Sequence, residues 1–417
     1  MTPRTPCLLL MFLPLLVCAS VETARGQQPE EIKGAPAEPA DAAEVRAQIA
    51  TVERLKNVLP DRGAALFFLA AAKQHLGETL EALRLLKECV ALRQGFDPSG
   101  EPAFRGLKET KEFGEMIESV RREYPMVAKA RVAFVAEERD LVPEGLAFDE
   151  KQNVFYLSSL NRRKIVKISQ DGVFTDFVPA GRDRLLPVLG IRLDPTDGTV
   201  WANCFTERGA TELVHYDTNG VLLGRYEPKD RLKHGFNDLV LRKNGDVIIT
   251  DSLNNSVMRF DRKTSTFAPV SLHREIVYPN GIALADDDKQ LFVADALGVV
   301  RVDLTTGTSA DVNPGPHSTL AGFDGMYWYK GALVGVQNGI GAPRVAAFRL
   351  SSDGLSVKQT TILENHSAQT TLPTTGAIRG NDFYFIANSQ IDNMNDDRVL
   401  DSTRLERVRI AMVHLPW

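Results

Sequence analysis

The chain has 417 residues, of which 43% are hydrophobic and 25% charged, and its formal net charge is −5. A chain of this length can bury enough apolar surface to fold without disulfide bonds. The weak negative balance argues against nucleic acid and anionic membranes as partners, because both attract basic proteins.

The first 26 residues have the pattern of a secretory signal peptide. Arg4 provides a positive start, an apolar run extends from Cys7 to Ala19 with one interruption at Pro14, and Gly26 is a second small residue near the end. The run is too short to span a bilayer comfortably. We therefore predict an exported protein, periplasmic or extracellular, that is cleaved after Ala19 or Gly26 and has no membrane span afterwards. The alternative is an uncleaved membrane anchor.

Residues 27–40 are rich in Glu, Pro, Gln and Ala, a composition that predicts a disordered linker. The apolar residues of 41–125 then follow helical spacing, with a last helix expected at about 103–122, before Pro125. This helical region either packs as a cap against the rest of the chain or docks a protein partner.

Within the helical region, the stretch from Ala65 to Leu92 resembles a single tetratricopeptide repeat. Gly77 separates its two amphipathic helices, and Ala82 stands where the helices of such a repeat pack tightly. One repeat is too short to build a superhelical groove for a peptide.

In residues 130–417 a short apolar strand with a common opening recurs six times. The openings begin at Glu144, Leu189, Asn237, Asn280, Asp324 and Thr375, 43 to 51 positions apart. A period near 45 residues with several strands per unit is typical of β-propeller blades. The last period lacks a strand, which we expect Arg131 to Ala136 to supply from upstream, so that the ring closes without an exposed edge. We therefore predict a mainly β protein, a six-bladed β-propeller with a small N-terminal α-helical region; five blades are the main alternative.

Four of the six openings carry an oxygen donor: Glu144, Asn237, Asn280 and Asp324. The inner strands of a propeller surround a central channel, so equivalent positions at their starts form a ring around its mouth. Two carboxylates and two amide carbonyls are donors that hard cations prefer. The sequence therefore predicts one divalent cation at this mouth, with Ca²⁺ as the preferred candidate.

A second ring of short polar residues is expected where the second strand of each blade returns to the mouth. The residues of this ring are Ser158, Asn203, Asp251, Asp295, Asn338 and Asn388. Asp251, Asp295 and Asn388, together with Asn237, are candidates for binding a substrate beside the ion. His234, two residues before the Phe-Asn-Asp opening, is a further candidate. The alternative for each is a local structural role, because Asp and Asn often cap turns at strand ends and a turn histidine needs no part in catalysis.

The four donor openings read Pro143-Glu144-Gly145, Phe236-Asn237-Asp238, Pro279-Asn280-Gly281 and Phe323-Asp324-Gly325. In order and spacing they resemble the metal-site motifs of the gluconolactonase, senescence-marker-protein (regucalcin) and paraoxonase superfamily of six-bladed propellers, over residues 132–417. The resemblance implies one divalent ion, usually calcium, and hydrolysis of lactones or related esters. It also implies that Glu144, Asn280 and Asp324 are direct ligands and that Asp324 is the candidate base. Asn237 would be a ligand or would hold the substrate or a metal-bound water.

Two departures from the superfamily pattern qualify this resemblance. Gly235 stands where gluconolactonase-type members usually carry an arginine that holds sugar hydroxyls, which favours a different or less polar substrate. Gly145 stands where the paraoxonase branch has an acidic residue for a second calcium, so we expect one ion.

The leading expectation is an exported calcium-dependent hydrolase of a lactone or related ester, in which Asp324 and Asn237 act in catalysis. The main alternative is a non-enzymatic, calcium-stabilised propeller that binds a ligand or a protein partner, with contacts from the helical region. Other chemistry at the same ring, such as a lyase reaction, is a third possibility.

Overall fold

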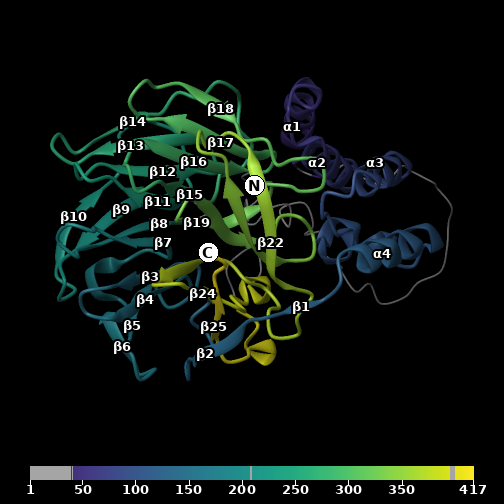
Figure 1. Ribbon diagram of the computed structural model, residues 1–417. Coiled ribbons are helices and arrows are strands. Elements are labelled where there is room, and N and C mark those ends of the chain that lie inside the picture. The colour runs from purple at the N-terminus through teal and green to yellow at the C-terminus, as the bar shows by residue number, and fades with distance from the viewer. Residues whose placement is uncertain (1–38, 40, 207–208, 395–399) are drawn as a thin grey trace, which may run out of the picture.

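The protein is a closed six-bladed β-propeller with a group of helices beside it (Figure 1), as predicted. The inner strands contact one another in sequence order and the last contacts the first, which closes the ring. The predicted signal peptide and nearly all of the predicted linker lie outside the described residues. The computed structural model describes residues 39, 41–206, 209–394 and 400–417.

The first three blades are four-stranded antiparallel sheets whose strands run in sequence order from the channel outward. Blade one consists of β3 (Leu146–Asp149), β4 (Val154–Ser159), β5 (Lys164–Ile168) and β6 (Phe174–Val178). Blade two consists of β7 (Val188–Leu193), β8 (Val200–Phe205), β9 (Thr211–Tyr216) and β10 (Leu222–Tyr226). Blade three consists of β11 (Phe236–Leu241), β12 (Val247–Asp251), β13 (Ser256–Asp261) and β14 (Thr266–Pro269).

The last three blades include two strands from upstream of the propeller. Blade four consists of β15 (Ile282–Leu284), β16 (Gln290–Asp295), β17 (Gly298–Asp303) and β18 (Ser309–Asp311). Blade five consists of β19 (Phe323–Tyr329), β20 (Ala332–Gln337), β21 (Arg344–Leu350) and β22 (Val357–Asn365), with β1 (Val127–Ala128) on its outer edge. Blade six consists of β23 (Gly376–Arg379), β24 (Asp382–Ile386) and β25 (Arg409–His414), completed by β2 (Arg131–Val135).

The strand β2 closes the ring as the sequence predicts. It pairs antiparallel with β25, with Phe134 opposite Ile410. The ring of Phe134 also packs against Phe155 of blade one and Tyr384 of blade six. The upstream strand therefore completes blade six and joins it to blade one.

The hydrophobic core lies between the faces of neighbouring blades. Trp201 of β8 is fully buried and packs with Phe236 and Phe260 of blade three. Phe292 of blade four and Phe323 of blade five share another such cluster. Because each blade has a neighbour on both faces, its strands are buried on both sides and carry apolar runs in place of strict alternation.

The helical region contains α1 (Ala42–Leu55), α2 (Arg62–His75), α3 (Thr79–Ala91) and α4 (Lys111–Glu123). Gly77 adopts the left-handed conformation (φ +77°) at the turn between α2 and α3. The resemblance of this pair to a tetratricopeptide repeat stays a prediction. The single helix expected at 103–122 is wrong in extent: a 3₁₀ helix ends at Leu107, and α4 begins after Thr110, whose hydroxyl accepts the Phe113 N–H. The 3₁₀ helices are Pro98–Gly100, Pro102–Leu107, Arg182–Arg184, Ile391–Asn393 and Ser402–Arg404.

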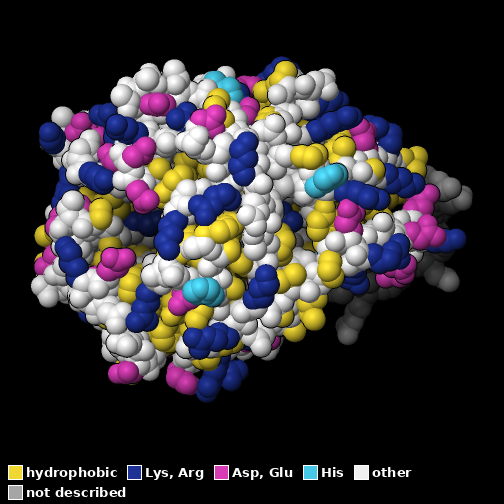
Figure 2. Space-filling model, viewed as in Figure 1, with side chains coloured by type: hydrophobic (Ala, Val, Ile, Leu, Met, Phe, Trp, Pro, Cys, Tyr) yellow, Lys and Arg dark blue, Asp and Glu magenta, His cyan; other side chains and the backbone are white. Residues whose placement is uncertain are grey.

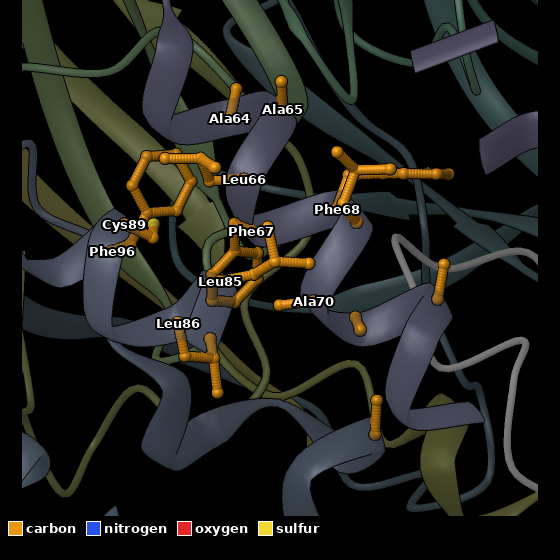
Figure 3. Close-up of a cluster of buried hydrophobic side chains, with 14 of the residues drawn as sticks. Ala64, Ala65, Leu66, Phe67, Phe68, Ala70, Leu85, Leu86, Cys89 and Phe96 are labelled. Atoms are coloured by element: carbon orange, nitrogen blue, oxygen red, sulfur yellow. The ribbon is translucent and has the colours of Figure 1, made fainter. Parts of the chain in front are cut away.

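The helices pack against blades four and five and share one hydrophobic core with them. Residues of α2 and α3 such as Phe67 and Leu86 form its centre (Figure 3). Val277, Leu297 and Ile340 complete it from loops of the propeller. These loops precede an inner strand or follow a second strand, so the helices lie against the face on which the inner strands begin.

On the face seen in Figure 2, basic and acidic side chains are interspersed over both the blades and the helices. This face presents no extended field of one sign. Among the described residues, no helix is both long and apolar enough to cross a membrane.

Candidate functional site

The starts of the inner strands form a closed ring at one face of the propeller. Thr375 Oγ1 donates to the carbonyl of Glu144 (2.5 Å) and links blade six to blade one. At Gly145 a Cβ would lie 2.3 Å from the carbonyl oxygen of Leu189 in blade two, so this junction has room only for glycine. Equivalent contacts connect the other blades: Asn203 with Asn237, Thr250 with Asn280, Gly281 with Phe323, and Gly325 with Thr374. All four predicted metal-site residues therefore stand on one ring.

Two of the predicted ligands are in direct contact. Asn280 Nδ2 donates to Asp324 Oδ1 (2.9 Å), and Asn338 Nδ2 donates to Asp324 Oδ2 (2.6 Å). Burial raises the pKa of Asp324 to about 7; the two amide donors oppose this effect, and the charge of Asp238 adds to it. Burial thus favours the protonated form of this carboxyl, and a neighbouring cation would favour its ionised form.

Glu144 is separated from Asp324 along the ring by blade six. Its side chain is largely buried, and its Oε1 accepts a hydrogen bond from Ser389 Oγ (2.9 Å). Its carbonyl accepts the bond from Thr375 that closes the ring. Both partners belong to blade six, which therefore positions this second carboxylate.

Asn237 lies on the same ring, between blades two and four. Its Nδ2 donates to Ser252 Oγ (3.1 Å), and Ser252 Oγ donates to the carbonyl of Pro279 (2.6 Å), the residue before Asn280. This chain of bonds turns the amide nitrogen of Asn237 toward blade four.

The oxygen donors of this ring fit a hard cation. Asn280 Oδ1 is buried and has no hydrogen-bond partner among the described residues, although a buried amide oxygen normally has one. It lies on the same side chain that contacts Asp324, and Glu144 adds a second carboxylate to the ring. The described part of the chain contains no group of three His, Cys, Asp or Glu side chains that could hold a metal ion. A site here therefore depends on amide oxygens as well as carboxylates, which Ca²⁺ accepts.

His234 is held between two carboxylates. Its Nδ1 contacts Asp251 Oδ2 (2.5 Å) and its Nε2 contacts Asp230 Oδ1 (2.9 Å). Burial disfavours the charged imidazole, but the bonds and charges of the two carboxylates outweigh burial and raise the pKa of His234. Asp251 is fully buried and also accepts the Gly235 N–H (2.9 Å) from the segment before β11 and, as a turn cap does, the Asn254 N–H (3.4 Å). Substrate binding by His234 or Asp251 would require these internal contacts to break.

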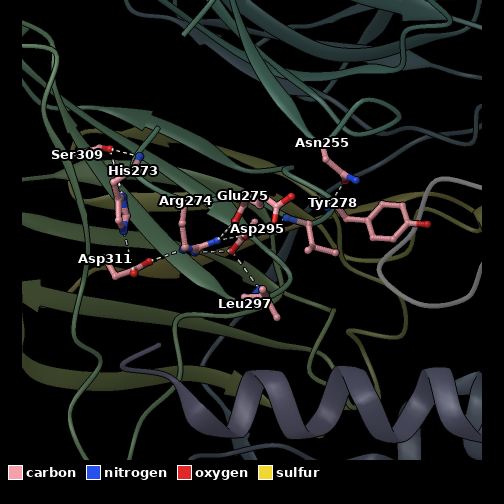
Figure 4. A network of polar contacts seen from close by, with 10 residues as sticks. Asn255, His273, Arg274, Glu275, Tyr278, Asp295, Leu297, Ser309 and Asp311 are labelled. Carbon is pink, nitrogen blue, oxygen red and sulfur yellow. Dashed lines mark hydrogen bonds and ion pairs between the residues drawn. The ribbon is translucent and has the colours of Figure 1, made fainter. Parts of the chain in front are cut away.

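Asp295 is engaged in a buried network at the end of β16 (Figure 4). Its Oδ2 pairs with Arg274 (2.7 Å) and accepts the Val277 N–H (3.0 Å), while its Oδ1 accepts the Leu297 N–H (3.1 Å). Arg274 also reaches Asp311 on β18 (2.7 Å). The contacts of Asp295 match its structural alternative, a turn cap with an added ion pair.

Asn388 is likewise used inside its own blade. Its Nδ2 donates to the carbonyl of Arg407 (3.0 Å) and its Oδ1 accepts the Arg409 N–H (2.7 Å). Its neighbour Ser389 is the residue that reaches Glu144. Side chains alternate between the two sides of an extended segment. The side chain of Asn388 therefore bonds within blade six, whereas that of the next residue, Ser389, lies at the site.

Three residues that the repeat motifs did not single out make contacts across the channel. Arg192 of β7 pairs with Asp238 of β11 (2.7 Å), and its guanidinium lies 4.8 Å from the centre of the Tyr327 ring on β19. Blades two and five face each other in a six-bladed ring, so these side chains cross the channel. A substrate would therefore reach the ring from the mouth. The sequence feature that could have pointed to this contact is Asp238 itself, which stands where the other five openings have glycine.

No protein-family model and no curated protein match this chain. Solved structures that resemble it include a gluconolactonase from Xanthomonas campestris. It is 17% identical, covers 70% of this chain and 98% of its own, and has a TM-score of 0.47.

Two other similar structures have different activities. A virginiamycin B lyase from Staphylococcus aureus is 19% identical, covers 67% of this chain and 87% of its own, and has a TM-score of 0.46. The PQQ-bound aldose sugar dehydrogenase from Streptomyces coelicolor is 15% identical, with coverages of 69% and 99% and a TM-score of 0.46. Similarity at this level carries no argument about activity.

Proposed function

We propose that the protein is an exported, calcium-dependent hydrolase of a lactone or a related ester. The observation that carries the proposal is the contact between Asn280 and Asp324 at the mouth, where an unsatisfied amide oxygen adjoins a buried carboxyl. With Glu144 on the same ring, these donors favour a hard divalent cation. The four donor openings support the substrate class, and Gly235 favours a lactone less polar than that of a sugar acid.

In this proposal Glu144, Asn280 and Asp324 hold the ion, which when bound polarises the substrate carbonyl. Asn237 orients the substrate or the attacking water. Asp324 accepts a proton from that water while the water oxygen bonds to the carbonyl carbon. As the C–O bond to the leaving oxygen then breaks, Asp324 returns the proton to that oxygen, and a lactone gives a hydroxy acid. Contact with a cation lowers the pKa of a carboxylate and weakens it as a base, whereas burial raises it at Asp324. Asn338 helps to fix the orientation of Asp324.

The second candidate function is a non-enzymatic propeller that binds calcium and a ligand or partner. The internal contacts of His234, Asp251 and Asp295 favour this second function. They leave Asp324 as the main candidate for proton transfer, and contact with the ion would weaken Asp324 as a base.

A panel of lactones and esters, assayed with calcium-free protein and after calcium is restored, separates the two candidates. We expect calcium-dependent turnover that Glu144→Gln greatly reduces at limiting calcium, while the exposed control Glu150→Gln keeps the activity. Calcium binding without turnover of any member of the panel would favour the binding protein.

A further inference from the structure

The approach to Asn280 is held by the helical region. Gln48 of α1 donates from Nε2 to the hydroxyl of Tyr278 (3.0 Å), two residues before Asn280. Tyr278 and Val277 both pack against the core of the helical region. Tyr278 has a φ of +49°, a conformation that an aromatic residue keeps only when its surroundings enforce it. The helices therefore help to fix the chain immediately before this predicted ligand.

The approach to Asp324 is held by Asp61, the N-terminal cap of α2. Asp61 Oδ1 accepts the Ala64 N–H (3.2 Å), and its Oδ2 accepts Thr319 Oγ1 (2.7 Å) and the Leu320 N–H (3.0 Å). Asp61 and Thr319 are both buried. Hydrogen bonds to a carboxylate away from water are among the stronger ones. One side chain thus joins a helix start to the segment that leads into the site.

The loop that follows Asn338 is paired with the helical region through its backbone. The Asp97 N–H donates to the carbonyl of Ile340 (3.0 Å), and the Asp97 carbonyl accepts the Ala342 N–H (2.9 Å). At Gly341 a Cβ would lie 1.8 Å from the Asp97 carbonyl oxygen, so the two segments approach as closely as backbones can. The loop that carries the second amide donor to the site carboxyl is therefore also attached to the helices.

The rest of the ring is supported differently. The contacts described above for Glu144 come from Ser389 and Thr375, and the contact of Asn237 comes from Ser252. All of these partners belong to the propeller. The helical region thus attaches to blades four and five, the two blades that carry the contact between Asn280 and Asp324.

We infer that the helical region is a structural support of the binding site, which positions Asn280, Asp324 and Asn338 and thereby sets the affinity for the ion. The inference rests on the proposed metal site and assigns the helices a part in it. Asp61, Gln48 and Asp97 are positioning residues, because they act on the site through the loops that they hold.

Asp61→Asn tests this inference in the full-length protein. Asparagine caps a helix as well as aspartate does, but a neutral amide is a weaker acceptor for Thr319 and Leu320. Gln48→Ala is the second variant and loosens the approach to Asn280. The control is Thr110→Ala, which removes the cap of α4 inside the helical region, where its hydroxyl bonds Leu107 and Phe113.

The two measurements are calcium affinity by isothermal titration and hydrogen exchange of the segments 276–283 and 318–326. We expect Asp61→Asn to weaken calcium binding by about fivefold or more, as energetic coupling between sites typically does, and to speed exchange in 318–326. Gln48→Ala should weaken binding in the same direction and speed exchange in 276–283. Thr110→Ala should change neither quantity.

Wild-type calcium affinity in both Asp61→Asn and Gln48→Ala would overturn the inference, and so would an equal loss in Thr110→Ala. If Asp61→Asn does not fold, Gln48→Ala decides alone. If the unmutated protein binds no calcium, the proposed metal site fails, and hydrogen exchange then decides about the support. Faster exchange in the two variants would uphold a positioning role for the helices, and unchanged exchange would refute it.

Discussion

Asp324 is at once a predicted ion ligand and the predicted base, and one substitution separates these roles. Asp324→Asn keeps the shape and one carbonyl donor but removes the charge and the ability to take a proton. Calcium affinity should fall, because one of the two carboxylates on the ring is lost. Saturating calcium should restore occupancy, while turnover should stay low by about 100-fold or more, the usual size of a general-base contribution.

The rate of turnover of the best substrate of the panel, measured as a function of calcium concentration, reports both the calcium affinity and the rate at saturation. Asp171→Asn, at an exposed turn of blade one, is the matched control and should behave as the unmutated protein does. Full recovery of rate in excess calcium would show that Asp324 is a ligand alone and that the proton goes elsewhere.

Glu101, in the helical region, is a buried acid whose titration should appear in the stability of the protein. Burial raises the pKa of Glu101 from 4.5 to about 7, and its bond from the Ala103 N–H opposes this only in part. Between these two values the folded state holds a proton that the unfolded state releases, so stability falls as pH rises from about 4.5 to about 7. The loss amounts to a few kcal/mol at most, at about 1.4 kcal/mol per pH unit.

Glu101→Gln cannot titrate and should lack this loss. Urea unfolding of both proteins at pH 4.5 and pH 8 should therefore show the variant gaining stability relative to the parent at the higher pH. The same difference between the two proteins at both pH values would contradict the assignment.

Among the elements, β2 carries the closure of the propeller. Phe134→Ala removes the ring that packs against Phe155 and Tyr384, so it should lower the free energy of unfolding by about 2 kcal/mol or more. Val132→Ala on the same strand is the control, because Val132 is exposed and its loss should cost little. If both changes lower the unfolding temperature equally, the aromatic side chain of Phe134 adds nothing to the closure of the propeller.

For the whole molecule, the repeat of about 45 residues was sufficient to predict six blades, the closing strand and the common ring of strand starts. This succeeds because each blade repeats one local pattern and the ring places equivalent residues side by side. The polar partners could not be predicted in the same way. Arg192 and Tyr327 lie far apart in sequence and meet only because their blades face each other across the channel.

The second ring of polar residues shows that side-chain contacts between nearby loops are also difficult to predict from the sequence. Asp251, Asp295 and Asn388 stand at strand ends as predicted, yet their side chains bond neighbouring loops. Whether such a residue faces the channel or its own blade depends on a register of one residue, which spacing alone does not fix. The position of the helices on blades four and five was also beyond the sequence, since it depends on the fit between surfaces rather than on a period.

The predicted export of the protein has a direct readout. Expressed with its native N-terminus in a secreting host, the protein should appear outside the cytoplasm, and the mature chain should begin at Ser20 or Gln27. Mass spectrometry of the intact protein identifies the cleavage point. An uncleaved N-terminus on membrane-associated protein would support the anchor instead.

The central claim is that Glu144, Asn280 and Asp324 hold one calcium ion at the mouth of the propeller. The most direct measurement is a calorimetric titration of the calcium-free protein with Ca²⁺, together with Glu144→Gln and Asn280→Ala. The account predicts one ion per chain in the unmutated protein and an affinity at least about tenfold weaker in each variant, the cost of about 1.4 kcal/mol for a lost ligand. No binding to the unmutated protein, or unchanged affinity in both variants, would contradict it.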